Sequence, residues 1–300
     1  MRAALPALAL APVVAVLGAA SWTPRAPVPE ARTEVAAALA GNRIVVVGGF
    51  LADGSTTARA DAYVPATDAW SRVADLPAAV NHAAAATLNG SAVIAGGYAG
   101  SRPSRGVFVL RGNLWAALPR LPFPRAAAGA AALGGDLYVV GGVGPNGLAR
   151  NALRWDGRRW RAVPGPTRRE HLAVTAAGGR VYAIGGRTAG YDTNLALVES
   201  WRPGERRWRL EPPLPEPRGG TGAAAVAGTV VSIGGEAPSG TLAHVYTFDV
   251  ARRRWSGLPD LPTPRHGLGV VAVRDTVYVL AGGPEPGLHV SAANEALRLG

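Results

Sequence analysis

A pair of adjacent glycines recurs six times along this 300-residue chain at nearly regular spacing. Each pair ends a short apolar run, as in NRIVVVGG, DLYVVGG and RVYAIGG. The pairs begin at Gly48, Gly96, Gly141, Gly185, Gly234 and Gly282, at intervals of 48, 45, 44, 49 and 48 residues. Four short strands with their turns occupy about forty to fifty residues. The spacing therefore predicts six copies of a four-stranded unit, the sequence pattern of a six-bladed propeller.

Aromatic residues recur with the same period. A tryptophan follows the glycine pairs by 18 to 22 residues in five units, at Trp70, Trp115, Trp160, Trp208 and Trp255. Another aromatic precedes each of them, and a Pro-rich turn such as ALPRLPFPR follows most of them. This order of elements over residues 22–300 resembles the Kelch repeat. The resemblance implies an all-β, six-bladed Kelch β-propeller, but Kelch propellers include adaptors, mutarotases and copper oxidases, so it leaves the function open.

The two markers have different physical roles in such a ring. Paired glycines let the backbone bend sharply where the blades crowd the central axis. Large rings fill the wider gaps between blades at the outside, each burying about 150–250 Å². The inner strands are correspondingly poor in bulk, as in AAAAT and TGAAAVAG.

The sixth tryptophan lies at the other end of the chain. Trp22 precedes Arg32 by ten residues, the interval that also separates Trp115 from Arg125. The chain ends in NEALRLG, which has the pattern of a third strand without a fourth. We expect the N-terminal strand to complete the last blade, closing the ring and removing open sheet edges.

The first twenty residues, MRAALPALALAPVVAVLGAA, have the pattern of a secretory signal peptide. One arginine is followed by an apolar stretch and by small residues at 18–20. The expected organisation is therefore a signal peptide at 1–20 and a propeller at 21–300, with the mature protein secreted or in the periplasm or cell envelope. The alternative is an uncleaved membrane anchor, because residues 3–20 carry no charge and approach spanning length.

Composition is consistent with an exported bacterial protein. Cysteine is absent, so disulfide and thiol chemistry play no part. All 31 basic residues are arginine, which together with abundant alanine, glycine and proline is typical of a GC-rich bacterial genome. Without the leader, 30 arginines face 20 acidic residues, a net charge of +10. No nucleic-acid recognition motif is present, so nucleic acid is not an expected partner.

Three arginine-rich turns follow the third strands of successive units. Their arginines are Arg158, Arg159, Arg161, Arg206, Arg207, Arg209, Arg252, Arg253 and Arg254. A solvated basic rim is the simpler interpretation. The alternative is weak peripheral attraction to an anionic envelope surface or polymer.

The opposite face carries the candidate ligand site. Arginine stands about sixteen residues before five of the six glycine pairs, at Arg32, Arg125, Arg169, Arg218 and Arg265, whereas Val80 occupies the remaining unit. These arginines either bond to turn carbonyls or surround one mouth of the channel. In the second case their guanidinium groups would bind a carboxylate, sulfate or phosphate.

Titratable residues follow these arginines closely. Glu34, His82 and His171 lie two residues beyond the arginine position, and Glu170 and His266 lie one residue beyond it. Strand alternation would direct some of them into the channel, so His82, His171 and His266 are candidate ligand-binding residues. A metal site is not predicted, because these histidines come from units that need not be adjacent and lack second ligands at fixed spacing.

These observations favour a secreted, non-catalytic binding module for an anionic small molecule, glycan, protein or peptide, acting as a monomer without a cofactor. Catalytic motifs are missing, and the absence of cysteine excludes the radical chemistry of galactose-oxidase-like Kelch proteins. The alternative is a mutarotase-like enzyme that acts on an anionic sugar such as sialic acid. Glu170, His171 and Glu34 would then be its acid–base residues.

The leader makes one prediction. Expressed in a bacterium with its own N-terminus, the protein is expected outside the cytoplasm with Ser21 as its first residue, because small residues at 18–20 mark the cleavage site. N-terminal sequencing of the recovered protein checks this. A membrane-bound product that begins at Met1 would instead support the anchor.

Overall fold

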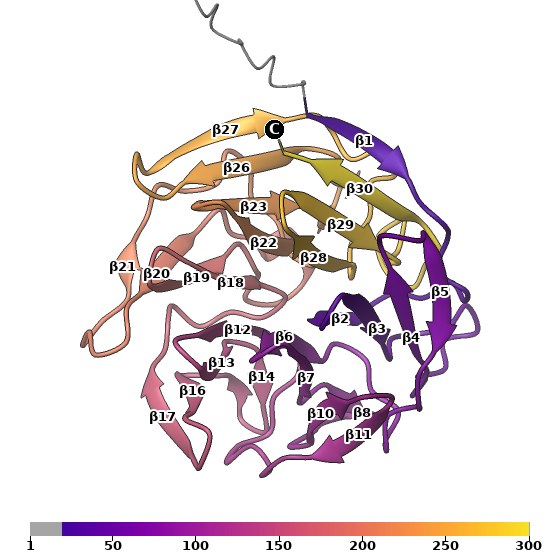
Figure 1. Cartoon of the computed structure of the whole chain (residues 1–300). Coiled ribbons are helices and arrows are strands. Elements are labelled where there is room, and N and C mark those ends of the chain that lie inside the picture. The colour runs from indigo at the N-terminus through magenta and orange to yellow at the C-terminus, as the bar shows by residue number, and fades with distance from the viewer. Residues whose placement is uncertain (1–19, 300) are drawn as a thin grey trace, which may run out of the picture.

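The computed structural model describes residues 20–299, in which six four-stranded antiparallel sheets surround a central channel (Figure 1). The predicted all-β, six-bladed propeller is confirmed. Within residues 20–299 the helical content is one short 3₁₀ turn, η1 (Tyr191–Thr193), and no helix is long and apolar enough to cross a membrane. The predicted leader cleavage concerns residues that, except for Ala20, lie outside this range.

Each blade runs from an innermost strand at the channel to an outermost strand at the rim. The innermost strands are β2 (Ala36–Ala40), β6 (Ala84–Leu88), β12 (Gly129–Leu133), β18 (Ala173–Ala177), β22 (Gly222–Val226) and β28 (Gly269–Val273). The second strands are β3 (Arg43–Val47), β7 (Ser91–Ala95), β13 (Asp136–Val140), β19 (Arg180–Ile184), β23 (Thr229–Ile233) and β29 (Thr276–Leu280).

The two outer positions complete each sheet. The third strands are β4 (Ala60–Val64), β10 (Val107–Arg111), β16 (Asn151–Trp155), β20 (Val198–Trp201), β26 (Val245–Asp249) and β30 (Asn294–Arg298). The outermost strands are β5 (Ala69–Arg72), β11 (Leu114–Ala117), β17 (Trp160–Pro164), β21 (Arg209–Leu210), β27 (Arg254–Leu258) and β1 (Ser21–Pro24). Three small hairpins extend the loops, β8 (Tyr98–Ala99) with β9 (Arg102–Pro103), β14 (Val143–Gly144) with β15 (Gly147–Leu148), and β24 (Glu236–Ala237) with β25 (Gly240–Thr241).

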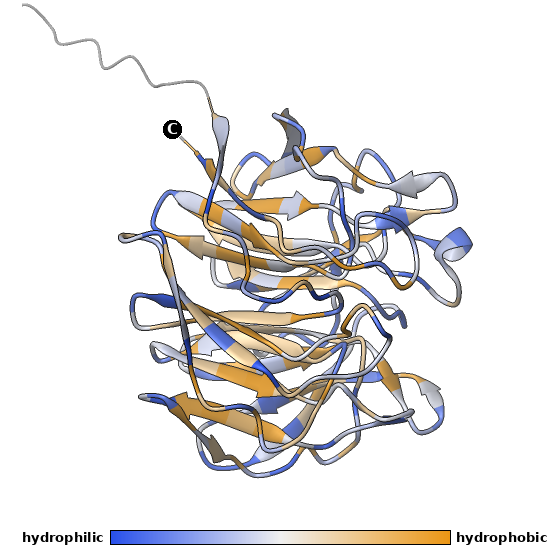
Figure 2. Ribbon diagram, turned by 90° about the vertical axis from the view of Figure 1, so that its right-hand side faces the viewer, coloured by the Kyte–Doolittle hydropathy of each residue, from blue (hydrophilic) through white to orange (hydrophobic). Residues whose placement is uncertain are grey.

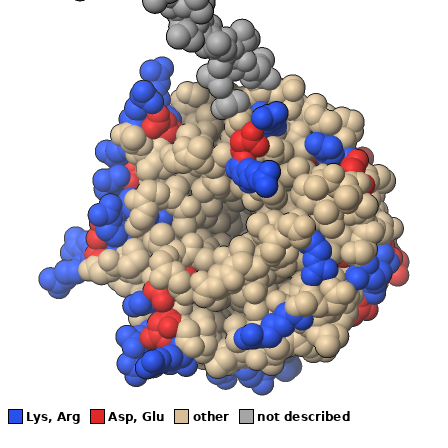
Figure 3. Space-filling model, viewed as in Figure 1, with Lys and Arg blue, Asp and Glu red and all other residues tan. Residues whose placement is uncertain are grey.

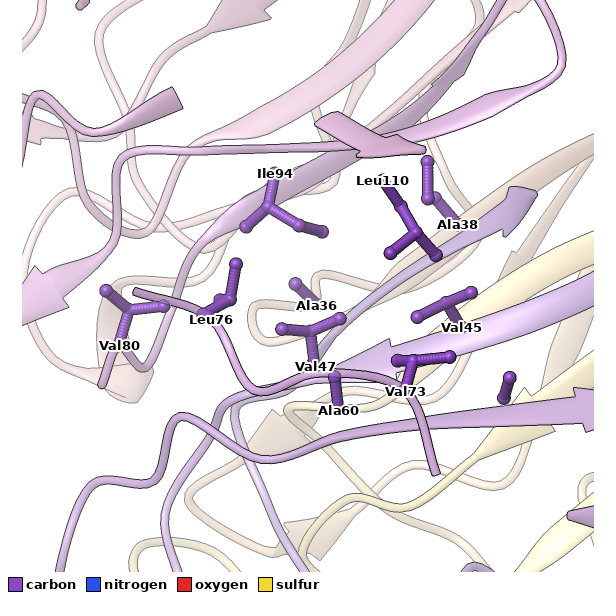
Figure 4. Packing of buried hydrophobic residues seen from close by; sticks show 12 residues of the cluster. Ala36, Ala38, Val45, Val47, Ala60, Val73, Leu76, Val80, Ile94 and Leu110 are labelled. Atoms are coloured by element: carbon purple, nitrogen blue, oxygen red, sulfur yellow. The ribbon is translucent and has the colours of Figure 1, made fainter. Parts of the chain in front are cut away.

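The core lies between neighbouring blades. The second strands are buried on both faces, which explains their continuous β-branched runs such as IVVV at 44–47. Between the first two blades, for example, Val45 and Val47 pack against Ile94 and Leu110 (Figure 4). Apolar residues follow the strands inside the ring, and polar residues follow the loops and turns (Figure 2).

The ring is closed as the sequence predicted. Strand β1 pairs antiparallel with β30, with Trp22 opposite Leu297, and the two strands lie side by side in Figure 1. The Trp22 indole N–H donates a hydrogen bond to the Pro259 carbonyl at 2.9 Å, in the link from the preceding blade. Trp115 makes the equivalent bond to Ala74 at 2.8 Å. Trp22 is therefore the sixth member of the tryptophan set.

The glycine pairs do more than allow the backbone to bend near the axis, because they also connect neighbouring blades. The second glycine donates its amide to the backbone carbonyl at the arginine position of the next blade, as from Gly97 to Arg125 at 2.8 Å. A Cβ on Gly96 would lie 2.2 Å from that same carbonyl oxygen, so the first glycine allows the two backbones to approach. In the last blade the residues at the equivalent positions are Ala281 and Gly282, one residue before the glycine pair of the sequence. Gly282 donates its amide to the Arg32 carbonyl at 2.8 Å.

Closure makes a testable prediction about Trp22. Trp22→Ala and Trp115→Ala are expected to lower the free energy of unfolding by similar amounts. Both residues are partly buried and make the same inter-blade hydrogen bond. Removing a fully buried large aromatic costs about 3–5 kcal/mol of unfolding free energy, and we expect a smaller loss for each of these two variants. Thermal melts of the two variants check this. A frayed terminus would leave the Trp22→Ala midpoint unchanged.

Candidate functional site at the channel mouth

Six equivalent residues form the rim of the channel mouth on the side of the glycine-pair loops. This mouth ring consists of Glu34, His82, Ala127, His171, Gly220 and Gly267, which all have left-handed backbone conformations with φ between 50° and 64°. From the second blade onward, each ring amide donates to the ring carbonyl of the preceding blade at 2.9–3.0 Å. The Val35 amide closes the circle on the Gly267 carbonyl at 3.1 Å. The ring is narrow, and its side chains converge.

The structure brings together the titratable residues that the sequence singled out. His82 Nε2 lies 3.2 Å from Glu34 Oε2, and His266 Nδ1 lies 3.2 Å from Glu34 Oε1. The rings of His82 and His171 meet edge to face, with centroids 4.9 Å apart. Only Ala127 separates these two histidines around the ring, and its small side chain leaves room for their contact.

A second layer of charged residues supports this cluster. Glu170 Oε1 lies 3.2 Å from His171 Nδ1, and Arg187 pairs with Glu236 at 2.7 Å while reaching Glu170 at 3.5 Å. Sequence reasoning missed Arg187 and Glu236. Both directly follow a glycine pair, at a position that is Phe50, Tyr98 or Val143 in the first three blades. A charged residue at this otherwise uncharged position is the sequence feature that could have indicated their place at the mouth.

The protonation states of the cluster follow from its burial and charges. Burial lowers the pKa of His82 to about 4 despite the opposing effect of Glu34, so His82 is neutral at neutral pH. Burial would raise the pKa of Glu34, but His82 and His266 outweigh it and hold that pKa below its usual range. Burial opposes protonation of His266, yet the hydrogen bond that His266 donates to Glu34 and the nearby carboxylates Glu34 and Glu236 raise its pKa.

The five arginines behave differently from the prediction that they surround the mouth. Their side chains are buried, and four of the residues have an exposed fraction of zero. Arg32 Nη2 pairs with Asp61 at 2.7 Å, Arg169 pairs with Glu199, and Arg265 pairs with Glu295, in each case on the third strand of the same blade. Burial lowers the pKa of Arg32 to about 10, so it remains charged.

The remaining two arginines are held without a third-strand acid. The Arg218 guanidinium carbon lies 5.0 Å from the centre of the Tyr246 ring, and the group also pairs with Glu216. Arg125 donates to the backbone carbonyls of Pro124 at 2.9 Å and Asn151 at 3.3 Å. All five arginines therefore brace turns and blades, and the expected ring of free guanidinium groups is wrong in its geometry.

The channel below the mouth ring is narrow and lined by small residues. A cavity of about 130 Å³ lies beside the ring and the first residues of the innermost strands. A second cavity of about 250 Å³ lies further along, between alanines, valines, Thr87 and Thr175. His244 and His289 are exposed, so they take no part in this site.

Comparison with known proteins agrees with this architecture. The model of the Kelch motif matches residues 31–77, 124–167 and 168–215, which cover the first, third and fourth blades. The chain is thus a six-bladed β-propeller in which three of the blades match the Kelch motif. A search of the curated proteins found no match.

The buried arginines make a prediction about stability. Arg169→Ala is expected to lower the free energy of unfolding by about 3–5 kcal/mol, because Glu199 would remain buried without its partner. Arg168→Ala is the matched control, since the neighbouring Arg168 is exposed and its loss should change stability by less than about 0.5 kcal/mol. Urea unfolding followed by tryptophan fluorescence measures both. Equal small losses would mean that the buried pair does not brace the blade.

Proposed function

We propose that this propeller is an exported, monomeric, non-catalytic binding module that recognises an acidic protein or peptide through an arginine rim. The arginine rim consists of Arg158, Arg159, Arg161, Arg206, Arg207, Arg209, Arg252, Arg253 and Arg254. These residues occupy the turns before and the starts of β17, β21 and β27, the outermost strands of three consecutive blades.

The exposure of these side chains carries the proposal. All nine are exposed, and basic side chains gather along the left-hand margin of the molecule, over β17, β21 and β27 (Figure 3). Four of them pair with carboxylates, Arg161 with Asp156, Arg209 and Arg253 with Glu211, and Arg252 with Asp249. The other five have no carboxylate of residues 20–299 within 4.0 Å. They are available to an acidic partner.

The shape and composition of the rim favour a protein partner. The arginines project from turns of three blades along the outer margin, so they suit an extended surface with several carboxylates better than a small molecule. Leu210 lies beside Arg209 with 65% of its surface exposed. Arginine is enriched in protein interfaces relative to the rest of the surface.

The enzyme alternative finds less support in the site. A mutarotase-like reaction on an anionic sugar needs a cation for the substrate carboxylate beside the acid–base residues Glu34, Glu170 and His171. Arg32 and Arg169 are buried within their blades, and Arg187 already pairs with Glu170 and Glu236. The mouth therefore offers such a substrate no uncommitted guanidinium group among the described residues.

The proposal predicts salt-sensitive binding to an acidic peptide. Poly-glutamate should bind the protein and be released as salt shortens the Debye length to about 8 Å at 0.15 M. Substituting Arg206, Arg207 and Arg254 by alanine should weaken binding by about tenfold. Each exposed charge pair contributes about 0.5 kcal/mol, and the three together match the about 1.4 kcal/mol that corresponds to a tenfold change in affinity. Fluorescence anisotropy of a labelled peptide measures this.

A control with the same change in charge tests the location. Arg102, Arg120 and Arg168 are exposed but lie on connections at the opposite ends of the strands, so substituting all three by alanine should leave the affinity nearly unchanged. If both triple variants bind the peptide equally weakly, the loss of affinity comes from net charge alone, and the arginine rim is not the binding site. Preferential binding of a sulfated or carboxylated glycan over the peptide would replace the protein partner by a polysaccharide.

A further inference from the structure

Three side chains of the mouth ring have the geometry of metal ligands. Glu34, His82 and His171 each offer a ligand atom, and these atoms all lie within 4.8 Å of one another. They come from the first, second and fourth blades, at positions fixed by the inter-blade hydrogen bonds of the ring. The site is therefore built on a rigid frame rather than on a mobile loop.

The orientation of His82 is the most informative detail. His82 Nδ1 lies 2.6 Å from Asn81 Oδ1, while Asn81 Nδ2 donates to Thr56 Oγ1 at 2.8 Å. With the amide oxygen toward the imidazole, as in the structure, His82 donates its Nδ1–H, and in that neutral tautomer Nε2 carries a lone pair. That lone pair faces Glu34 Oε2 at 3.2 Å. A proton or a metal ion between these two atoms would remove the contact between two acceptors.

The neighbours of these side chains hold them as outer partners hold metal ligands. Glu170 Oε1 lies 3.2 Å from His171 Nδ1 without hydrogen-bond geometry, and His266 Nδ1 makes a hydrogen bond of 3.2 Å to the second oxygen of Glu34. Phe50 and Tyr98 pack edge-on against the His82 ring, with centroids 5.8 and 5.6 Å away. Carboxylate and carbonyl partners on the far nitrogen are the usual supports of a ligating histidine.

We propose that Glu34, His82 and His171 bind a divalent transition-metal ion, of the class to which Zn²⁺ belongs, at the channel mouth. Two imidazoles and one carboxylate favour Zn²⁺, Co²⁺ or Ni²⁺ over Mg²⁺ and Ca²⁺, which prefer oxygen ligands alone. Three protein ligands leave a further coordination position, and the cavity of about 130 Å³ beside the ring offers space for its occupant.

The surrounding charge also favours a cation. The carboxylates of Glu34, Glu170 and Glu236 gather at the mouth, where Arg187 is the arginine that pairs with two of them. His82 and His171 come from blades that are not adjacent, yet they meet at the mouth. The ring is so narrow that His82 and His171 touch across Ala127.

The test uses the mature protein without an affinity tag, freed of metal by a chelator. Titration with Zn²⁺ is expected to show a single ion bound per chain with micromolar or tighter affinity. Titration with Co²⁺ should give the visible absorption of a site with nitrogen ligands. Removing an outer partner of a metal ligand typically weakens metal binding by about 10–100-fold. His82→Ala and His171→Ala remove ligands themselves, so each should weaken Zn²⁺ binding by more than this.

Two controls make the result decisive. The alanine variants should fold, because Ala127 already occupies the equivalent ring position with a φ of 50°, and circular dichroism verifies this. His244→Ala and His289→Ala remove exposed histidines away from the mouth ring and should leave Zn²⁺ affinity unchanged. Asn81→Ala, which releases the Nδ1–H of His82, should weaken binding by about 10–100-fold.

Two outcomes would overturn the metal site. One is wild-type protein that binds neither Zn²⁺ nor Co²⁺ with a single-site isotherm. The other is metal binding that survives in folded His82→Ala and His171→Ala proteins. Neither outcome affects the arginine rim, whose poly-glutamate binding is measured without metal, so the two proposals fail independently.

Discussion

The backbone hydrogen bond between neighbouring blades is the interaction on which the rest of this propeller depends. The second residue of each glycine pair, or of Ala281–Gly282 in the last blade, donates its amide to the carbonyl at the arginine position of the next blade. In three blades the arginine itself holds a third-strand carboxylate of its own blade. One residue thereby joins two blades through its carbonyl and braces its own through its side chain. The cost of burying the guanidinium is offset because the carboxylate and several carbonyls satisfy it.

The mouth ring follows from the same contacts. Blades held this closely bring the residue two beyond each arginine position against its neighbour, in a left-handed conformation that glycine adopts at no cost and other residues adopt under strain. Half of the ring is Ala127, Gly220 and Gly267, and half is Glu34, His82 and His171. Strained polar residues at this position are consistent with a selected site.

The sequence predicted the fold because its markers repeat, whereas it could not orient the side chains of the site. Glycine pairs, tryptophans and the Trp22 interval were enough for six blades and their closure. The arginine positions were located correctly, but periodicity does not say whether a guanidinium points into the channel or into the blade. The sequence did contain a signal, since the acidic residues Asp61, Glu199 and Glu295 occupy the second position of their third strands, 29 or 30 residues after their arginines. Where Val80 replaces the arginine, Phe108 occupies the matching third-strand position.

The positive charge of the chain thus divides into two populations with different roles. Four of the five buried arginines pair with carboxylates and Arg125 bonds to backbone carbonyls, so the high arginine content says nothing about the chemistry of the mouth. The exposed arginines lie on turns between third and fourth strands, which antiparallel pairing places at the opposite end of each blade from the glycine-pair loops. Carboxylates and imidazoles gather at one face, and uncommitted guanidinium groups gather near the other. A cation at the mouth and an acidic partner at the rim are therefore compatible on one molecule, since the channel between them is lined by small, mostly uncharged side chains.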